Sequence, residues 1–219
     1  MAIQFFLDND LIYDTIKKIY INKPNIIRPC LDILKRFTEN DFKIISKHID
    51  EELINVIVIL MDSVLSEFKQ DSLDILINLL QHQDLCDELF SIKVVEAVNQ
   101  IIDSDNTSRI KQSALNCLYK FLENGEERIF KSLIKGYHIL DKIRFMLESD
   151  NIDLLIETLN LLNLILIIVE CYKNELTTFI VEKLNEKIKD LVYELTSSQN
   201  KNISSLSETI LNYIENKDN

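Results

Sequence analysis

The sequence predicts an all-α fold in which similar groups of helices stack into a right-handed superhelix, an α-α solenoid. The first observation is an internal repeat, since four six-residue segments align with Leu at the third and sixth positions and with Asp or Asn at the fourth. These segments are Pro29–Leu34, Asp71–Leu76, Ser113–Leu118 and Glu157–Leu162, at intervals of 42, 42 and 44 residues. A repeat of this length in helical sequence is typical of stacked-helix solenoids.

Two further observations support long helices joined by short polar turns. The chain has only 2 Gly and 2 Pro in 219 residues, too few for the tight turns of a β-protein. Apolar residues also recur every three or four positions, as they do on one face of a helix. In residues 108–122, for example, Ile110, Ala114, Leu118 and Phe121 follow this spacing.

One repeat unit can be followed in full. A long helix over 108–122 ends at Gly125, which we expect to serve as its C-cap. A shorter helix covers 126–135 and is broken by Gly136, and a third covers 138–147. A polar turn then precedes the next long helix, which starts near Ile152.

The same order of long, short and medium helices recurs along the chain, which predicts a single repeat domain over 1–219. Its approximate repeats are 1–37, 41–80, 84–122, 126–170 and 172–216. The expected long helices of the other repeats are 25–37, 66–80 and 204–215. The expected short and medium helices are 11–20, 41–49, 51–62, 84–91, 94–102, 172–182 and 184–195.

This helix order and the positions of Gly125 and Gly136 resemble the armadillo repeat, and Gly136–Leu140 is similar to the entry of that family's second helix. A HEAT repeat, with two helices and no Gly break, fits less well. The segment Leu140–Ile143 and the following helix further resemble importin α. The chain has no Trp, however, so the Trp–Asn array of that family is absent. The resemblance implies the fold and a general peptide-holding role.

In armadillo proteins the long helices line a concave groove, so equivalent positions on them are candidate binding residues. The fourth segment position forms an Asp/Asn row, which consists of Asp32, Asp74, Asn116 and Asn160. The positions four residues later, one helical turn away, are Arg36, Asn78, Lys120 and Leu164. Asn can pair with a peptide backbone and Asp with Lys or Arg. The Asp/Asn row is either the solvated edge of each helix or a ladder that holds an extended peptide.

The net charge of −12 and pI of about 4.7 indicate the kind of partner. Nucleic acids and anionic membranes would be repelled, because both are bound largely through Lys and Arg. A basic protein or peptide is favoured, although acidity also serves solubility. The longest apolar run, 161–169, is too short to cross a bilayer. Together with the lack of a secretory signal pattern, this predicts a cytoplasmic or nuclear protein.

Residues that could carry enzyme or metal chemistry are few. The cysteines Cys30, Cys86, Cys117 and Cys171 are far apart, and His82 with Cys86 offers two metal ligands at most. Two Gly cannot build a phosphate-binding loop. We therefore expect no catalytic residue, no metal, no cofactor and no small-molecule substrate.

Two functional hypotheses follow. The first is a non-catalytic armadillo scaffold or adaptor that holds a partner segment in its groove, with nucleocytoplasmic transport or complex assembly as the setting. The second is an Hsp70 nucleotide-exchange factor, which the size and the repeat number resemble.

Overall fold

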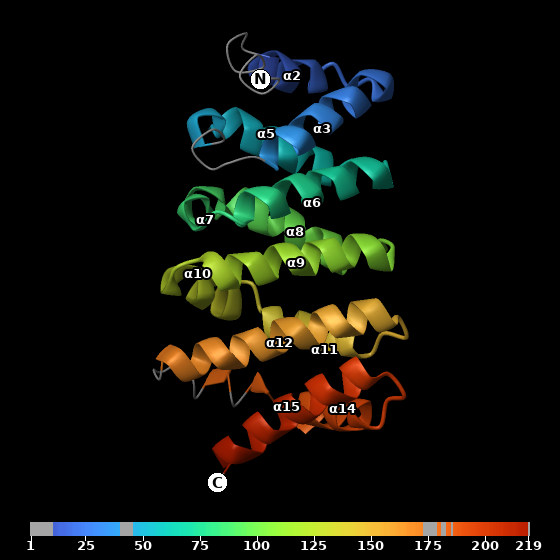
Figure 1. Ribbon diagram of the computed structural model, residues 1–219, viewed down its shortest axis with the longest axis vertical. Coiled ribbons are helices and arrows are strands. Elements are labelled where there is room, and N and C mark those ends of the chain that lie inside the picture. The colour runs from blue at the N-terminus through green and yellow to red at the C-terminus, as the bar shows by residue number, and fades with distance from the viewer. Residues whose placement is uncertain (1–10, 40–45, 173–178, 181–182, 185, 219) are drawn as a thin grey trace. The chain divides into compact units, whose positions relative to one another are not determined.

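A computed structural model of the chain describes residues 11–39, 46–172, 179–180, 183–184 and 186–218. These residues form helices joined by turns, and no β-strand occurs among them (Figure 1). The chain divides into two compact units, residues 1–106 and 107–219. The boundary falls inside the expected repeat 84–122, and the expectation of a single domain over 1–219 stays a prediction.

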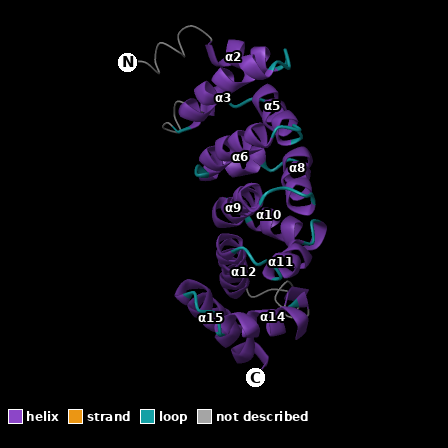
Figure 2. Ribbon diagram, turned by 90° about the vertical axis from the view of Figure 1, so that its right-hand side faces the viewer, coloured by secondary structure: helices purple, strands orange, loops and turns teal. Residues whose placement is uncertain are grey.

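The first unit contains two layers of helices. The long helices α3 and α6 pack against each other in one layer, and α5 and α8 pack together in the other (Figure 2). Helix α2 packs against both α3 and α5. The elements of this unit are α2 Leu11–Ile19, α3 Pro24–Thr38, the 3-10 turn η1 Ser46–His48, α5 Glu51–Met61, α6 Ser66–Leu80, α7 Gln83–Leu89 and α8 Ile92–Asp103.

The second unit repeats this arrangement. The long helix α12 packs between α9 and α15, while α11 packs against α14 in the other layer (Figure 2). The elements of this unit are α9 Ser108–Asn124, α10 Glu127–Lys131, the π-turn η2 Ser132–Gly136, α11 Ile139–Leu147, α12 Ile152–Tyr172, α14 Glu186–Thr196 and α15 Lys201–Asp218.

The aligned segments lie on the long helices, and their Leu residues form the core of both units. Leu31, Leu34 and the corresponding pairs in α6, α9 and α12 are at most 1% exposed. The second segment position is also buried and holds a small residue in every repeat, namely Cys30, Ser72, Ala114 and Thr158. Small side chains let neighbouring helices approach closely, so this position fixes the stacking distance within each unit.

Polar turns begin several helices through side-chain caps. The Asp50 carboxylate accepts a hydrogen bond from the Leu53 N–H at 2.9 Å and starts α5. In the second unit, Asn151 accepts from the Leu154 N–H at 2.9 Å and starts α12. Such caps satisfy N–H groups that the first helical turn leaves without a partner.

The glycines lie where the sequence predicts breaks, but for other reasons. Gly125 is the C-cap of α9, as the sequence predicts, and its backbone is extended (φ −86°). A Cβ at Gly125 would lie 2.4 Å from the Phe121 carbonyl oxygen, so close backbone approach requires glycine here. Beyond Gly136, where a Cβ would have room, the left-handed residue is His138 (φ 51°).

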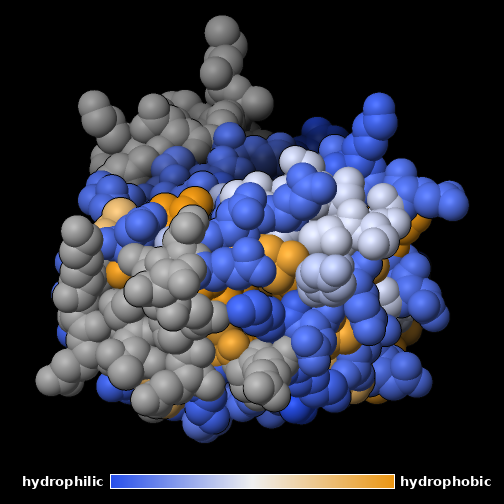
Figure 3. Space-filling model, turned by 90° about the horizontal axis from the view of Figure 1, so that it is seen from below, coloured by the Kyte–Doolittle hydropathy of each residue, from blue (hydrophilic) through white to orange (hydrophobic). Residues whose placement is uncertain are grey.

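Other boundaries differ modestly from the predicted ones. The segment 126–135 is divided into α10 and η2, and α12 continues to Tyr172. Most of the predicted helices 41–49 and 172–182 lies outside the described residues. Helix α15 closes the second unit with Ile210 and Ile214 buried. From below, most of the described surface is hydrophilic, with small apolar areas (Figure 3).

Candidate functional site

In the first unit, the predicted site residues form part of a polar network that joins α3 to α6. Lys35 on α3 donates a hydrogen bond to Asp74 on α6, and its Nζ lies 3.6 Å from an Asp71 carboxylate oxygen. Gln70 Nε2 donates to the other Asp74 oxygen at 2.8 Å. The carboxylate of Asp74 therefore has its partners within the chain.

The same network continues along both helices. Asn78 Nδ2 donates to Thr38 Oγ1 at 3.3 Å, and Arg28 Nε donates to Glu67 Oε1 at 3.0 Å. Asp32 and Arg36 are exposed on α3. Of the predicted site residues in this unit, Asp74 and Asn78 thus connect neighbouring repeats, and Asp32 and Arg36 face solvent.

Buried charge shapes the electrostatics of this network. Burial raises the pKa of Asp71, and the nearby carboxylates of Asp74 and Asp32 raise it further, while Lys35 opposes them. The hydrogen bond to Asp74 is the main cause that raises the pKa of Lys35. Lys35 therefore remains a cation held between the two carboxylates of Asp71 and Asp74.

In the second unit, the corresponding positions have few partners. Asn116 on α9 and Asn160 on α12 are half-buried, and neither amide forms a hydrogen bond within the described part of the chain. Lys120 pairs with Glu123 on its own helix at 2.5 Å. A side-chain hydrogen bond also joins α9 to the residue before α12, because Gln112 Nε2 donates to Asn151 Oδ1 at 3.2 Å.

Glu157 on α12 occupies the same repeat position as Asp71. It is half-buried, and burial is the main cause that raises its pKa, followed by the nearby carboxylate of Asp153. Asp71 has Lys35 beside it, whereas Glu157 forms no ion pair with a described residue. This carboxylate, with Asn116 and Asn160, can accept and donate hydrogen bonds to an incoming polar group.

The exposed face of α12 also carries aliphatic residues that the sequence interpretation missed, apart from Leu164. We call Ile156, Leu164, Ile167 and Ile168 the α12 stripe. Ile167 is 50% exposed and the other three are half-buried. The residues equivalent to Ile156, Leu164 and Ile167 are Gln70, Asn78 and Gln81 in the α6 repeat, Gln112, Lys120 and Glu123 on α9, and Arg28, Arg36 and Glu39 in the α3 repeat. Gln81 and Glu39 are the C-caps of α6 and α3. Extending the alignment beyond six residues would have revealed this difference.

Helix α12 is also strongly apolar along its length. Among the described helices, Ile152–Cys171 is long and apolar enough to cross a membrane by length and composition, and half of it is buried in the structure. The prediction that the apolar run 161–169 is too short to cross a bilayer is therefore wrong on length, because the apolar helix extends beyond both ends of that run. Its packing between α9 and α15 accounts for the buried half as core.

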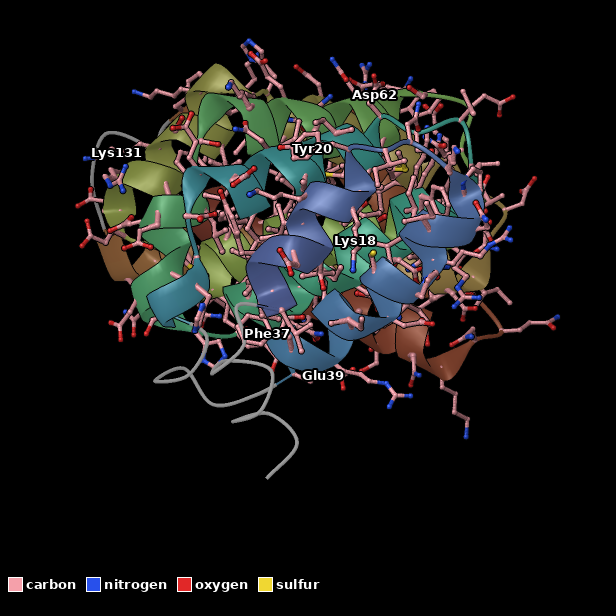
Figure 4. The ribbon with its side chains drawn as sticks, turned by 90° about the horizontal axis from the view of Figure 1, so that it is seen from above. Lys18, Tyr20, Phe37, Glu39, Asp62 and Lys131 are labelled. Carbon is pink, nitrogen blue, oxygen red and sulfur yellow. The ribbon has the colours of Figure 1, made fainter. Side chains whose placement is uncertain are left out.

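A separate apolar pocket lies in the first unit. It has a volume of about 440 Å³ and is lined by residues of α2, α3, α5 and α6 and of the turns between them, including Tyr20, Ile59 and Val64. In Figure 4, Tyr20 lies on the side of the unit away from Phe37 and Glu39, which mark the C-terminal end of α3. This pocket is distinct from the α3–α6 network.

The cysteine and histidine residues do not assemble a reactive centre in the described ranges. Cys86 is buried, its thiol lies 3.7 Å from the Leu80 carbonyl oxygen, and burial raises its pKa to about 11. It is therefore a protonated core residue, which disfavours its pairing with His82 on a metal. No three His, Cys, Asp or Glu side chains gather as metal ligands among the described residues.

The fold matches solved structures closely, although sequence comparison finds nothing. No family model and no curated protein matches the sequence. The designed armadillo repeat protein YIII(Dq)4CqI aligns with a TM-score of 0.77 and 15% identity, over 97% of this chain and 85% of that chain. Another, YIII(Dq.V1)4CPAF in complex with the peptide (KR)4, aligns with a TM-score of 0.80 and 14% identity over the same shares.

This chain has the armadillo repeat fold. A computationally designed armadillo repeat protein for modular peptide recognition also aligns, with a TM-score of 0.63 and 13% identity, over 91% of this chain and 98% of that one. The predicted all-α armadillo-type solenoid is thereby confirmed. At these identities, the comparison supports the fold and leaves the function to the residues of this chain.

Proposed function

We propose that the protein is a non-catalytic scaffold that holds a basic segment of a partner protein against the exposed faces of its long armadillo helices. The observation that carries the proposal is the group of Asn116, Glu157 and Asn160, which have no hydrogen-bond partners within the described chain. Amides of this kind match the alternating donors and acceptors of a peptide backbone. A half-buried carboxylate matches Lys or Arg, because charge-assisted hydrogen bonds are strong where water is partly excluded.

Two further points support this proposal. A solved protein of the same fold carries the basic peptide (KR)4, so helices arranged in this way are compatible with such a ligand. The net charge of −12 favours the approach of a cationic partner. In the first unit, Asp74 is already paired with Lys35 and is not available to a partner. The exposed Asp32 contributes to the long-range attraction of a cationic partner.

The test uses the peptide (Lys-Arg)4 with a C-terminal Trp. Because the chain has no Trp, the fluorescence anisotropy of this residue reports on the peptide alone. The combined variant Asn116→Ala, Glu157→Gln, Asn160→Ala should weaken binding about tenfold, since it removes one charged and two neutral hydrogen-bonding groups.

The matched control is Asn202→Ala, Asp190→Asn, which changes exposed residues on α15 and α14. It should leave the affinity within about twofold, because exposed groups that are not part of the proposed site have a small effect. Binding by the wild type should also weaken with added salt. Equal affinity of the site variant and the wild type would contradict the proposed site, and no binding by the wild type would contradict the proposed function.

A further inference from the structure

The α12 stripe is a feature that the armadillo fold itself does not require. At the positions of Ile156, Leu164 and Ile167, the other three aligned long helices carry Gln, Asn, Lys, Arg or Glu. The buried positions of those helices are nevertheless the same, with Leu115 and Leu118 of α9 matching Leu159 and Leu162 of α12. The aliphatic groups at these positions, of which Ile167 is 50% exposed and Ile156 and Leu164 are half-buried, are therefore not required by the core that the repeats share. Exposed apolar groups that are contiguous are a mark of binding surfaces.

The geometry of the stripe sets the size of what can cover it. Spacings of eight and three residues place Ile156, Leu164 and Ile167 on one face of α12, together with Glu157 and Asn160. The rise of about 1.5 Å per residue makes the stripe roughly 16 Å long from Ile156 to Ile167. An extended chain rises about 3.3 Å per residue, so a segment of about five residues would follow its full length.

The charges around the stripe indicate the chemistry of the occupant. Asp153 and Glu157 lie at the N-terminal part of the stripe, and Glu170 lies at its C-terminal end. Burial raises the pKa of Tyr213, and the charges of Glu170 and Cys171 raise it further. Lys120 on the neighbouring α9 is paired with Glu123. The field over the stripe is therefore negative. An anionic lipid surface would be repelled, and so would a second copy of this chain with net charge −12.

We infer that the α12 stripe, with Glu157 and Asn160 between its residues, anchors a partner segment in which large aliphatic side chains alternate with Lys or Arg. The aliphatic side chains pack on Ile156, Leu164 and Ile167, and a cation pairs with Glu157. This inference rests on the proposed function and makes it more specific, because it names the second unit as the main contact and a mixed apolar and basic sequence as the preferred ligand.

The experiment compares three peptides that each end in Trp, namely (Lys-Leu)4, (Lys-Arg)4 and (Glu-Leu)4. Anisotropy of the peptide Trp gives each affinity for the full chain. We expect (Lys-Leu)4 to bind at least tenfold more tightly than (Lys-Arg)4, because Leu side chains bury aliphatic surface on the stripe. We expect (Glu-Leu)4 to bind more weakly than (Lys-Leu)4 by a similar factor, because it meets Glu157 and Asp153 with like charge.

Two variants separate the stripe from apolar surface in general. The variant Ile156→Gln, Leu164→Asn, Ile167→Gln gives α12 the residues that α6 carries at these positions. It should lose about tenfold in affinity for (Lys-Leu)4 and stay within twofold for (Lys-Arg)4. The control is Ile59→Gln beside the pocket of the first unit, since Ile59 is 51% exposed and Ile167 is 50% exposed. It should leave both affinities within twofold, and thermal melts should show that both variants fold.

The outcomes distinguish the two proposals. If the wild type binds none of the peptides, the proposed function and this inference both fail. If it binds (Lys-Arg)4 as well as (Lys-Leu)4, or if the stripe variant binds (Lys-Leu)4 unchanged, the inference fails and the proposed function survives. Binding to phosphatidylcholine–phosphatidylserine vesicles that the stripe variant abolishes would overturn the inference in favour of a lipid surface. A wild-type dimer in sedimentation that the same variant dissociates would overturn it in favour of self-association.

Discussion

The long-helix faces of the two units occupy equivalent repeat positions, yet they are built for different tasks. On α3 and α6, charged and amide groups bind one another, as in the contacts of Lys35 with Asp74 and of Asn78 with Thr38. On α9 and α12, Asn116 and Asn160 have no partners among the described residues, and the α12 stripe replaces polar groups. The first face pairs its polar groups within its own unit, whereas Asn116, Glu157 and Asn160 of the second face have no hydrogen-bond partners among the described residues.

In a repeat fold, the buried positions and the exposed positions can vary independently. The buried Leu positions are the same in α6 and α12, so the backbone does not depend on what the exposed face carries. The exposed positions can then vary from repeat to repeat at little cost in stability. A similar backbone can thus contain one internally paired face and one open face.

The largest expected effect tests whether the two cores are equivalent. Ser72 on α6 and Thr158 on α12 occupy the same small position and are fully buried. Replacing either with Leu should destabilise its unit by about 1–3 kcal/mol, because an overpacked core must shift its helices. Urea denaturation followed by circular dichroism measures this loss. If only one of the two variants loses stability, the helices stack differently in the two units. The conclusion that the two units share one core arrangement would then be wrong.

A smaller effect is expected from breaking the α3–α6 network. Lys35→Ala removes a cation that joins two helices and leaves Asp71 and Asp74 close together. It should cost about 1 kcal/mol at low salt, since the pairs are partly exposed. The matched change Lys120→Ala removes a pair within one helix, which is worth about 0.3–0.5 kcal/mol. The midpoints of urea denaturation at about 20 mM and about 500 mM salt compare the two variants, because salt screens exposed charge pairs. Equal losses would mean that Lys35 does not connect the repeats.

Much of this fold could be predicted from the sequence, because the helical pattern is repeated and the core positions are nearly identical between repeats. The predicted helix 66–80 matches α6, Ser66–Leu80, at both ends. Errors arose where local geometry decides the outcome. Gly125 is the predicted C-cap, but the sequence does not show that the nearby Phe121 carbonyl oxygen is what requires glycine there, and the π-turn after α10 has no distinct sequence signal.

For the candidate site, the sequence predicted which repeat positions are equivalent, but not which side chains pair with one another. Alignment placed Asp74 and Asn160 at equivalent points, but it could not show that Lys35 and Gln70 already occupy Asp74. Such pairing depends on which side chains of neighbouring helices come into contact. The spacing of residues within one helix gives no information about those contacts. Glu157 was also missed, because a single Glu gains significance only through its burial and its lack of a cation.

The smallest expected effect concerns Glu157 and depends on pH. Its raised pKa means that the native state binds the proton more tightly than the unfolded chain does. The protonated carboxyl therefore stabilises the fold fully below the unfolded pKa of 4.5, and this contribution is lost as the pH rises through the native pKa. Glu157→Gln should accordingly be more stable than the wild type at pH 7. The gain should stay below about 0.5 kcal/mol, since water screens a half-exposed group, and it should vanish near pH 4.

The control for this last effect is Asp190→Asn, which removes an exposed carboxylate on α14. Any general relief of the net charge of −12 would stabilise both variants alike, whereas the local effect of burial appears only for Glu157→Gln. The midpoints of urea denaturation at about pH 4, 5, 6 and 7 distinguish the general charge effect from the local effect of burial, because carboxyl groups titrate at the lower end of this range. If both variants gain equally, Glu157 is simply one of many surface charges. If only Glu157→Gln gains, and it also loses peptide affinity, the chain keeps a slightly unfavourable carboxylate in place because a partner's cation neutralises it.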